Sequence, residues 1–465
     1  MKGKKWLLSI VVVVCCIALL GLSPAMGAKS KFDPSKMGDM SDLDLSNPVI
    51  PTGDTIKIAI VASFSGPAAA VGDIYFASVQ SVAHDYNKRG GILVDGKKKL
   101  VQVIKANHES KVPIAKKVSE RMVLQEKVDV LWGTNGSHLM KVINQVAHKY
   151  KTIAVSAAAV SDELYDAQNF SRYSFMTSIS TSQVGRGLAY YYGQMRKKES
   201  KFYILCQDYM FGHSIAKGFK AGLKEYYPDA ELVGEDYHKL FLTDFAPYLT
   251  KVKAAGAEVV YTGDWIPDAA NLLVQARQMG LDLPFANLFI NNPPFLQQVG
   301  IEGTDGLVHI GQIGSDGKAF KTEGQIKYYK AWNDQYPKWK KPFDTTTYEH
   351  GTGTIGAYRM QTYWLLDVIE RAGSTDPEKI IKVWENDTWE DVNGTVYKMR
   401  GIDHKTERDL FIELYVPPEQ QKESMNIEPY YWFKDCSNTG PSYKLPADKV
   451  TPVMDPKLKD IRKGS

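Results

Sequence analysis

The residues in this chain that could carry chemistry lie in short polar loops that directly follow apolar runs. Ser137 and His138 come after the apolar run 128–132, and the segment Ser156 to Ser161 ends another apolar run. Hydroxyl groups and backbone N–H groups at the start of a helix can bind a carboxylate without a lysine or arginine, because the helix field favours an anion there. The two loops therefore predict a binding site for a small carboxylate.

A carboxyl group of the chain itself follows a further apolar run, 259–262. Asp264 could neutralise a ligand's ammonium group, because an uncompensated charge in a closed site costs several kcal/mol. If Asp264 points inward, the ligand carries an ammonium group, and Trp265 packs against its side chain or makes a cation–π contact. If Asp264 points to solvent, the rings of Tyr209, Phe211 and Trp265 suit a neutral or aromatic carboxylate. The sequence leaves both interpretations open.

No set of residues predicts catalysis, a cofactor or a metal. The chain has no Gly-Lys-Ser/Thr phosphate loop, no His-Glu-x-x-His, and no nucleophile motif with histidine and aspartate partners. His138 is therefore interpreted as a hydrogen-bonding group rather than a base. The stretch 351–356 matches G-x-G-x-x-G once, but no buried strand precedes it, so we expect a helix start and no nucleotide site. Cys206 and Cys436 are too few for a zinc site, and a disulfide between them stays open.

The elements that position these loops alternate between strand and helix. Ile56 to Ala62 is an almost continuous apolar run, typical of a strand buried on both faces of a parallel sheet. An apolar stripe at helical spacing follows from Val71 to Tyr86. One such series runs to Ile179 and a second follows it, which exceeds a single core. We therefore expect an α/β fold with two doubly wound parallel sheets, whose ligands bind at the carboxyl ends of the strands.

An ordered series of short motifs extends this interpretation. From about Thr55 to Tyr415 the chain resembles the periplasmic amino-acid-binding proteins of branched-chain amino acid ABC transporters. The motifs that carry the resemblance are Ser65-Gly66-Pro67, Gly72-Asp73, Gly90-Gly91-Ile92, Trp132-Gly133, Asp208 to Gly212, Gln275-Ala276-Arg277, Ala372 to Pro377 and Asp403-His404. The resemblance implies the type I periplasmic binding fold, in which two lobes joined by a three-segment hinge close over a ligand. The implied ranges are 55–180 plus 315–401 for the first lobe and 181–314 plus 402–435 for the second, with crossings near Ser180, Gly314 and Gly401.

The resemblance also assigns ligand-binding residues. It implies that Ser137, Ala158 and Ala159 hold the carboxylate and amino group of an amino acid, or Ala157 and Ala158 if the register shifts by one residue. The chain departs from the family pattern at the missing threonine near Ala159 or Val160, at Phe211 and Val71 where tyrosines are expected, and near Phe289, where no acidic residue stands. Because family residues that bind the ligand's amino group are replaced in this chain, branched-chain amino acids are one ligand candidate among several.

The N-terminus predicts export. Residues 1–27 carry three lysines, an apolar stretch and small residues at a cleavage position, the pattern of a signal peptide; an uncleaved membrane anchor is the alternative. Residues 28–54 are polar and are expected to form a flexible tether, and residues 436–465 a C-terminal tail. Removal of residues 1–27 would lower the formal net charge from +4 to +1, so charge gives no support to nucleic-acid binding.

We therefore expect a periplasmic or extracytoplasmic solute-binding subunit of an ABC importer. This protein would bind a small ligand, either a branched-chain amino acid or another apolar or aromatic one, and deliver it to a membrane permease. It would not be an enzyme. An importer subunit for an aromatic or organic acid without the amino group is one alternative. A ligand-sensing receptor subunit of the same fold is another.

Overall fold

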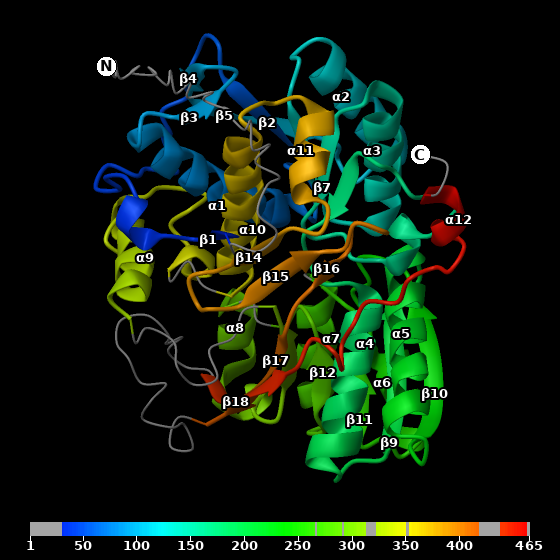
Figure 1. The fold of residues 1–465 in the computed structure, drawn as a ribbon. Coiled ribbons are helices and arrows are strands. Elements are labelled where there is room, and N and C mark those ends of the chain that lie inside the picture. Colours follow the sequence, from blue (N-terminus) through cyan, green and yellow to red (C-terminus); the bar gives the residue numbers. More distant parts are fainter. Residues whose placement is uncertain are drawn as a thin grey trace, which may run out of the picture.

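The computed structural model describes residues 30–265, 267–290, 293–312, 322–349, 353–417 and 438–462 (Figure 1). Its two large sheets are each covered by helices, which confirms the expected α/β class. We call the first sheet with its helices the first lobe, and the second sheet with its helices the second lobe. No helix in the described ranges is long and apolar enough to cross a membrane.

The first sheet consists of five parallel strands in the order β5-β2-β6-β7-β8. Their bounds are β2 (Ile56–Ala62), β5 (Val101–Asn107), β6 (Val130–Gly133), β7 (Ile153–Ser156) and β8 (Ser174–Met176). Ile58 and Ile60 of β2 pack into the layer of α1 (Ala69–Lys88) and α10 (Gly353–Ala372). Ala59 and Val61 pack into the opposite layer, with α2 (Val112–Leu124) and α3 (Ser137–Tyr150). The strand is therefore buried on both faces, as its apolar run predicts.

The second sheet repeats the same order and adds two antiparallel strands, giving β10-β9-β11-β12-β13-β17-β18. Its strands are β9 (Lys201–Gln207), β10 (Glu231–His238), β11 (Val259–Tyr261), β12 (Phe285–Asn287), β13 (Val308–Gly311), β17 (Leu410–Val416) and β18 (Asn438–Leu445). Helices α4 (Thr181–Tyr190) and α5 (Met210–Tyr226) pack on one face. Helices α6 (Ala246–Ala254), α7 (Asp268–Gln278) and α8 (Pro293–Thr304) pack on the other.

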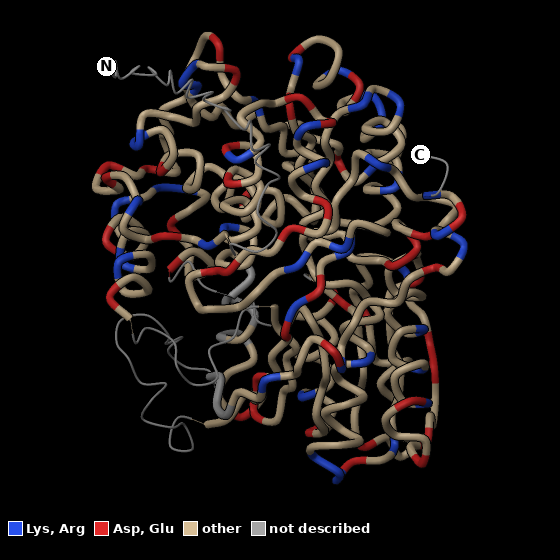
Figure 2. The backbone as a smooth tube through the Cα atoms, in the orientation of Figure 1, with Lys and Arg blue, Asp and Glu red and all other residues tan. Residues whose placement is uncertain are grey.

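The remaining elements are short and join or flank the lobes. A four-stranded sheet has the order β1-β14-β15-β16. The strands and helices outside the two large sheets are β1 (Ser30–Lys31), β3 (Ile92–Val94), β4 (Lys97–Lys99), β14 (Thr388–Glu390), β15 (Val396–Met399), β16 (Thr406–Glu407), α9 (Glu323–Asn333), α11 (Pro377–Trp384) and α12 (Leu458–Arg462). A π-helical turn, Tyr191–Arg196, continues α4. In Figure 2, lysines and arginines are interspersed with aspartates and glutamates over both lobes.

The N-terminal segment differs from the expected tether. Within residues 30–54, the side chains of Phe32, Met37, Met40, Leu43 and Leu45 are buried in the first-lobe core. Strand β1 pairs in parallel with β14, and the indole Nε1 of Trp339 donates to the Leu43 carbonyl oxygen at 2.8 Å. These five apolar residues are spaced singly among polar ones, so the segment has no helical or strand period, yet each of the five side chains enters the core. The signal-peptide expectation for residues 1–27 lies outside the described residues.

The C-terminal segment also differs from a plain tail. Strand β18 extends the second sheet beside β17, and residues 446–462 then run back toward the first lobe (Figure 1). The glycine-rich stretch 351–356 gives α10 its start at Gly353, and the 3₁₀ turn Thr346–Tyr348 precedes it, which agrees with the helix-start interpretation. Cys206 is buried on β9. Cys436 and the crossing near Gly314 lie outside the described residues, so the disulfide and that crossing stay predictions.

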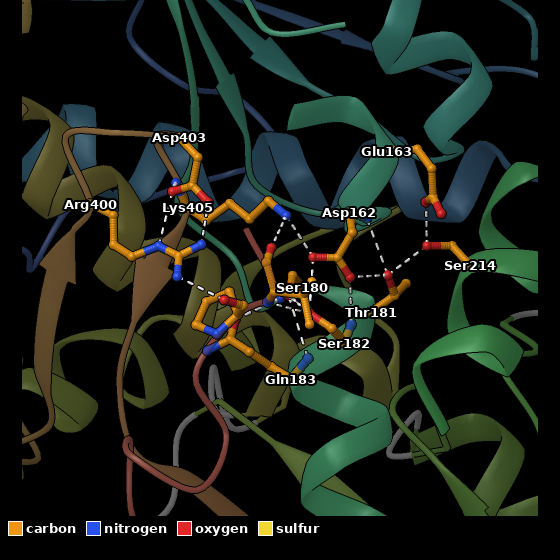
Figure 3. Close-up of polar contacts among 12 residues, drawn as sticks. Asp162, Glu163, Ser180, Thr181, Ser182, Gln183, Ser214, Arg400, Asp403 and Lys405 are labelled. Atoms are coloured by element: carbon orange, nitrogen blue, oxygen red, sulfur yellow. Dashed lines mark hydrogen bonds and ion pairs between the residues drawn. The ribbon is translucent and has the colours of Figure 1, made fainter. Parts of the chain in front are cut away.

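A buried polar cluster joins the lobes where the chain crosses between them (Figure 3). Asp162 accepts hydrogen bonds from Thr181 Oγ1 at 2.7 Å and from the Ser182 backbone N–H at 2.6 Å. Lys405 Nζ lies 2.7 Å from Asp162 Oδ1, and the Lys405 side chain is 2% exposed. Burial alone would raise the pKa of Asp162, but the Lys405 ammonium and the hydroxyl and N–H donors outweigh it and hold this pKa below its ordinary value.

The C-terminal segment is tied to the same cluster. Lys405 Nζ donates to the Val453 carbonyl at 2.8 Å, and the Val453 N–H donates to Ser182 Oγ at 3.0 Å. Arg400, which is paired with Asp403, donates from Nη1 to the Pro452 carbonyl at 2.7 Å. Residues of both lobes and of the C-terminal segment therefore share one set of buried charges.

Replacing the buried cation tests what this cluster contributes. Lys405→Met leaves the Asp162 carboxylate without its ion-pair partner, so we expect the free energy of unfolding at pH 7 to fall by about 3 kcal/mol in urea denaturation. Lys217→Met is the matched control, because Lys217 is 77% exposed and lies 3.4 Å from Glu163. It should cost less than about 1 kcal/mol. Equal losses in both variants would contradict the assignment.

The pH dependence of the free energy of unfolding of wild type and Lys405→Met gives a second prediction. Because the folded-state pKa of Asp162 is lowered, the contribution of the pair is complete above the unfolded pKa of about 3.9 and is lost as pH falls through the lower folded value. Without Lys405 the burial of Asp162 is no longer outweighed by a cation, so its pKa is higher in the variant, and the stability difference from wild type should shrink as the pH falls from 7 toward about 4 and continue to shrink below it. A difference that grows on acidification would sink this account.

Candidate ligand-binding site

The candidate site lies at the carboxyl ends of the strands where each sheet reverses its order. In the first sheet the reversal falls between β2 and β6, and in the second between β9 and β11. Open α/β sheets bind ligands at such points, because the loops that follow the two strands diverge there. The two edges face one another, since the His138 ring on α3 lies 5.4 Å from the Tyr209 ring before α5, edge to face at 87°.

The contact between His138 and Tyr209 is the inner wall of the site. Trp265 Nε1 donates to the Tyr209 hydroxyl at 2.9 Å, so two predicted aromatic residues of the second lobe form one unit. Burial lowers the pKa of His138, so its imidazole is neutral at pH 7. His138 Nδ1 is buried and has no hydrogen-bond partner in the described residues. The neutral His138 ring could therefore form a hydrogen bond through Nδ1 with a ligand group at this contact.

The two predicted carboxylate loops come together in the first lobe. Ser137 is the first residue of α3, after Gly136 with φ 88°, and it accepts a hydrogen bond from Ser161 Oγ at 2.7 Å. Ala158 is half-buried, whereas Ala157 and Ala159 are buried. The Ala157 N–H already donates to the Gly133 carbonyl at 3.0 Å.

Val160, which follows Ala158 and Ala159 in the predicted ligand loop, belongs to the core of the second lobe. Its side chain packs in the apolar cluster of the second lobe, and its carbonyl accepts from the Thr181 N–H at 2.9 Å. The loop 156–161 therefore touches both lobes at once. An apolar side chain at this position anchors the loop, which explains why no hydroxyl is found there.

Asp264 points inward, into the second lobe. Its side chain is fully buried, and its Oδ2 lies 2.8 Å from His238 Nε2. Burial would lower the pKa of His238, but the hydrogen bond and charge of Asp264 outweigh it and raise this pKa. Asp264 Oδ1 is buried and accepts no hydrogen bond from any described residue. The interpretation in which Asp264 points to solvent is therefore wrong.

Two other predicted residues have packing roles. Phe211 is buried in the second-lobe core, with its ring 6.0 Å from Tyr209 and 5.9 Å from Phe289. Val71, on α1, is half-buried against the first-lobe core. Asn287, two residues before Phe289, donates from Nδ2 to the Asp264 carbonyl at 2.8 Å.

Sequence reasoning missed several residues of the site. Tyr75 stacks edge to face on Trp132 at 5.2 Å and on Tyr358 at 5.0 Å, and Trp132 Nε1 is buried without a partner among the described residues. Burial raises the pKa of Tyr75, and the nearby Tyr358 and Tyr209 hydroxyls add to the shift. Tyr75 therefore lies beside the inter-lobe contact. In the sequence it is only one position of an apolar helical stripe, so no signal distinguished it.

Two buried histidines were also missed. His108 Nε2 lies 2.6 Å from Thr134 Oγ1, and burial together with the nearby His138 lowers the pKa of His108 to about 4. His238 ends β10 and is the partner of Asp264. The described residues contain no group of three or more His, Cys, Asp or Glu side chains that could hold a metal ion.

Comparisons with known proteins agree with this geometry. A family model described as periplasmic binding protein matches residues 55–413. The leucine-, isoleucine-, valine-, threonine-, and alanine-binding protein of Pseudomonas aeruginosa is 25% identical over 395 residues, covering 83% of this chain and 92% of that protein. The Leu/Ile/Val-binding protein of Escherichia coli K12 is 23% identical over 344 residues, covering 73% of this chain and 86% of that protein.

Solved structures share the fold. A Brucella ovis leucine-, isoleucine-, valine-, threonine-, and alanine-binding protein in a closed conformation superposes with a TM-score of 0.70 at 19% identity, covering 87% of this chain and 98% of that one. A solute-binding protein from R. palustris in complex with 4-hydroxybenzoate gives a TM-score of 0.67 at 18% identity, covering 85% and 98%. The fold is thus that of the type I periplasmic binding proteins, and the relatives are solute-binding proteins rather than enzymes. The chain belongs to the periplasmic binding protein family.

Proposed function

We propose that this chain is the extracytoplasmic solute-binding subunit of an ABC importer, which closes its two lobes on a small amino acid and delivers it to a membrane permease. Export by the N-terminal signal and the lobe ranges 55–180 plus 315–401 and 181–314 plus 402–435 are part of this proposal. The observation that carries it is the buried, unpaired Asp264 Oδ1 behind the contact between His138 and Tyr209.

The first lobe would hold the ligand's carboxylate. Ser137 stands at the N-terminal end of a 14-residue helix, where the helix field and N–H groups favour an anion. The half-buried Ala158 and its neighbour Ala159 fit the register of the family better than Ala157, whose N–H is taken by Gly133. A carboxylate here needs no cationic side chain.

The second lobe would hold the ligand's ammonium group. Asp264 is fixed by His238 on one oxygen and offers the other, and Trp265 stands next to it in the chain. Because the site is buried, a charged hydrogen bond to the ammonium group would contribute about 1.5–3 kcal/mol. In place of the acidic residue expected near Phe289, Asp264 would supply the carboxylate from the loop that follows the neighbouring strand β11.

One observation favours a second candidate, an importer subunit for an aromatic acid without an amino group. The rings of His138, Tyr209 and Trp265 meet at the site, and two structural relatives were solved with 4-hydroxybenzoate and 3,4-dihydroxybenzoic acid. A neutral aromatic ring would pack between such walls, with the same carboxylate loop at its acid end.

Calorimetric titration of the ligand-stripped mature protein separates the two candidates. We expect leucine or phenylalanine to bind, and 4-methylpentanoate and 3-phenylpropanoate, which lack the amino group, to bind at least about tenfold more weakly. Asp264→Asn should weaken the amino acids by about 10- to 100-fold and leave the amine-free acids unchanged. Asp208→Asn is the control, since Asp208 is exposed beside Tyr209. Tight binding of the amine-free acids in both proteins would support the aromatic-acid importer instead.

The neutral His138 nitrogen gives a separate prediction. His138→Phe keeps a ring against Tyr209 but removes Nδ1, so we expect ligand affinity to fall by about 3- to 10-fold, the net value of one hydrogen bond. Because burial lowers the pKa of His138 from its ordinary value of about 6.5, affinity in the wild type should not change through this residue between about pH 7.5 and 8. An unchanged affinity in His138→Phe would remove His138 from the ligand contacts.

A further inference from the structure

Three buried acceptor oxygens at the second-lobe edge have no donor. They are Gln207 Oε1, Asp264 Oδ1 and Asp268 Oδ1, on side chains that are at most 1% exposed. A buried polar atom left without a partner costs about 1–3 kcal/mol, and native structures rarely leave several together. Only Asp264 has a role in the function proposed above, so two of these oxygens remain unexplained.

The three side chains form one group, which we call the acceptor cluster. Gln207 ends β9, and Asp264 and Asp268 follow the neighbouring strand β11. Gln207 Nε2 donates to Asp268 Oδ2 at 2.7 Å. Burial and the nearby Asp264 charge raise the pKa of Asp268 to about 6. The two carboxyl groups therefore interact electrostatically, although Asp264 lies in the loop after β11 and Asp268 in the first turn of α7.

The acceptor cluster lies behind the aromatic wall of the site. The Phe241 backbone N–H donates to Asp268 Oδ2 at 2.9 Å, and the Phe241 ring meets Trp265 edge to face at 5.8 Å. Trp265 in turn holds the Tyr209 hydroxyl, and Tyr209 faces His138 of the first lobe. The cluster is thus on the second-lobe side of the contact between His138 and Tyr209.

The charges of the acceptor cluster are incompletely balanced. Its one ion pair is with His238, on Asp264 Oδ2, and in the described residues no lysine or arginine pairs with Asp264 or Asp268. Asp268 Oδ2 receives two neutral donors, from Gln207 and Phe241. Two carboxyl groups are balanced by only one imidazole, and the three free acceptor oxygens are complementary to a cation that brings several N–H donors.

We propose that the acceptor cluster binds a second, cationic donor group of the ligand, an amine or a guanidinium at the end of its side chain. This inference rests on the proposed function, in which the loop around Ser137 holds the carboxylate and Asp264 the α-ammonium group. The ligand would then be a small basic amino acid, whose aliphatic stem packs along Tyr209 and Trp265. The side-chain cation would meet Asp268 and Gln207 and give their free oxygens the donors they lack.

Lysine and norleucine provide the test, because they differ only in the terminal ammonium group. In calorimetric titration of the full mature chain we expect lysine to bind at least about 30-fold more tightly than norleucine, the value of a charged hydrogen bond in a buried site. Asp268→Asn keeps the shape and the acceptor that Phe241 uses, and should reduce this ratio to below about threefold while norleucine binds as in the wild type.

A second variant and a control keep the proposal falsifiable. Gln207→Met removes one acceptor and the neutral donor to Asp268 Oδ2 but no charge, and should lower the ratio by about 3- to 10-fold. Asp208→Asn, at the exposed neighbouring position, should leave the ratio unchanged. Equal affinities for lysine and norleucine in the wild type would overturn the proposal and leave the amino-acid function intact. Binding of amine-free acids alone would overturn the amino-acid function itself, and this inference with it.

Discussion

The ion pair between Lys405 and Asp162 is the contact on which the geometry of this protein depends. Asp162 follows the loop that begins at Ser156, and its carboxylate also accepts a hydrogen bond from the Ser182 N–H in the first turn of α4. The loop that approaches the ligand, the start of the second lobe and a later crossing of the chain therefore share one carboxylate. A charge pair with so little exposure tolerates few alternative geometries, because either ion alone would be costly to bury. The same contact thus fixes the loop 156–162 against the start of α4.

The two lobes contribute opposite chemistry to the site. The first lobe offers a serine, a neutral imidazole and a helix start, all of which are suited to an anion. The second lobe offers buried carboxyl groups and an amide oxygen behind aromatic rings. A ligand that carries both signs of charge would be complementary to both lobes only when they are closed. In the proposed function, opening the lobes would leave each half with a partial set of contacts, so the ligand would favour the closed arrangement.

The sequence predicted the parts of the structure that depend on local pattern. The buried strand at 56–62, the alternation of strands and helices, and the loops at Ser137 and Asp264 follow from apolar runs and the residues that interrupt them. The partner of Asp264 could not be predicted, because it depends on β10 and β11 lying on either side of β9 rather than on any spacing in the chain. The N-terminal segment was predicted wrongly as a tether, because singly spaced residues such as Phe32 and Leu43 carry no period even though the core takes them in.

The order in which the lobes can fold follows from the packing of α10 against α1. The Tyr363 hydroxyl donates to Asp85 Oδ2 at 2.8 Å across a separation of 278 residues, and both side chains are buried. The first lobe therefore cannot close its core until synthesis has passed α10, even though its sheet is complete by residue 176. Contacts of such high sequence separation are slow to form, since the loop-closure entropy must be met first. The nascent chain accordingly spends most of its synthesis with an unfinished N-terminal lobe, so the apolar strands of the first sheet stay exposed until the second lobe has been made.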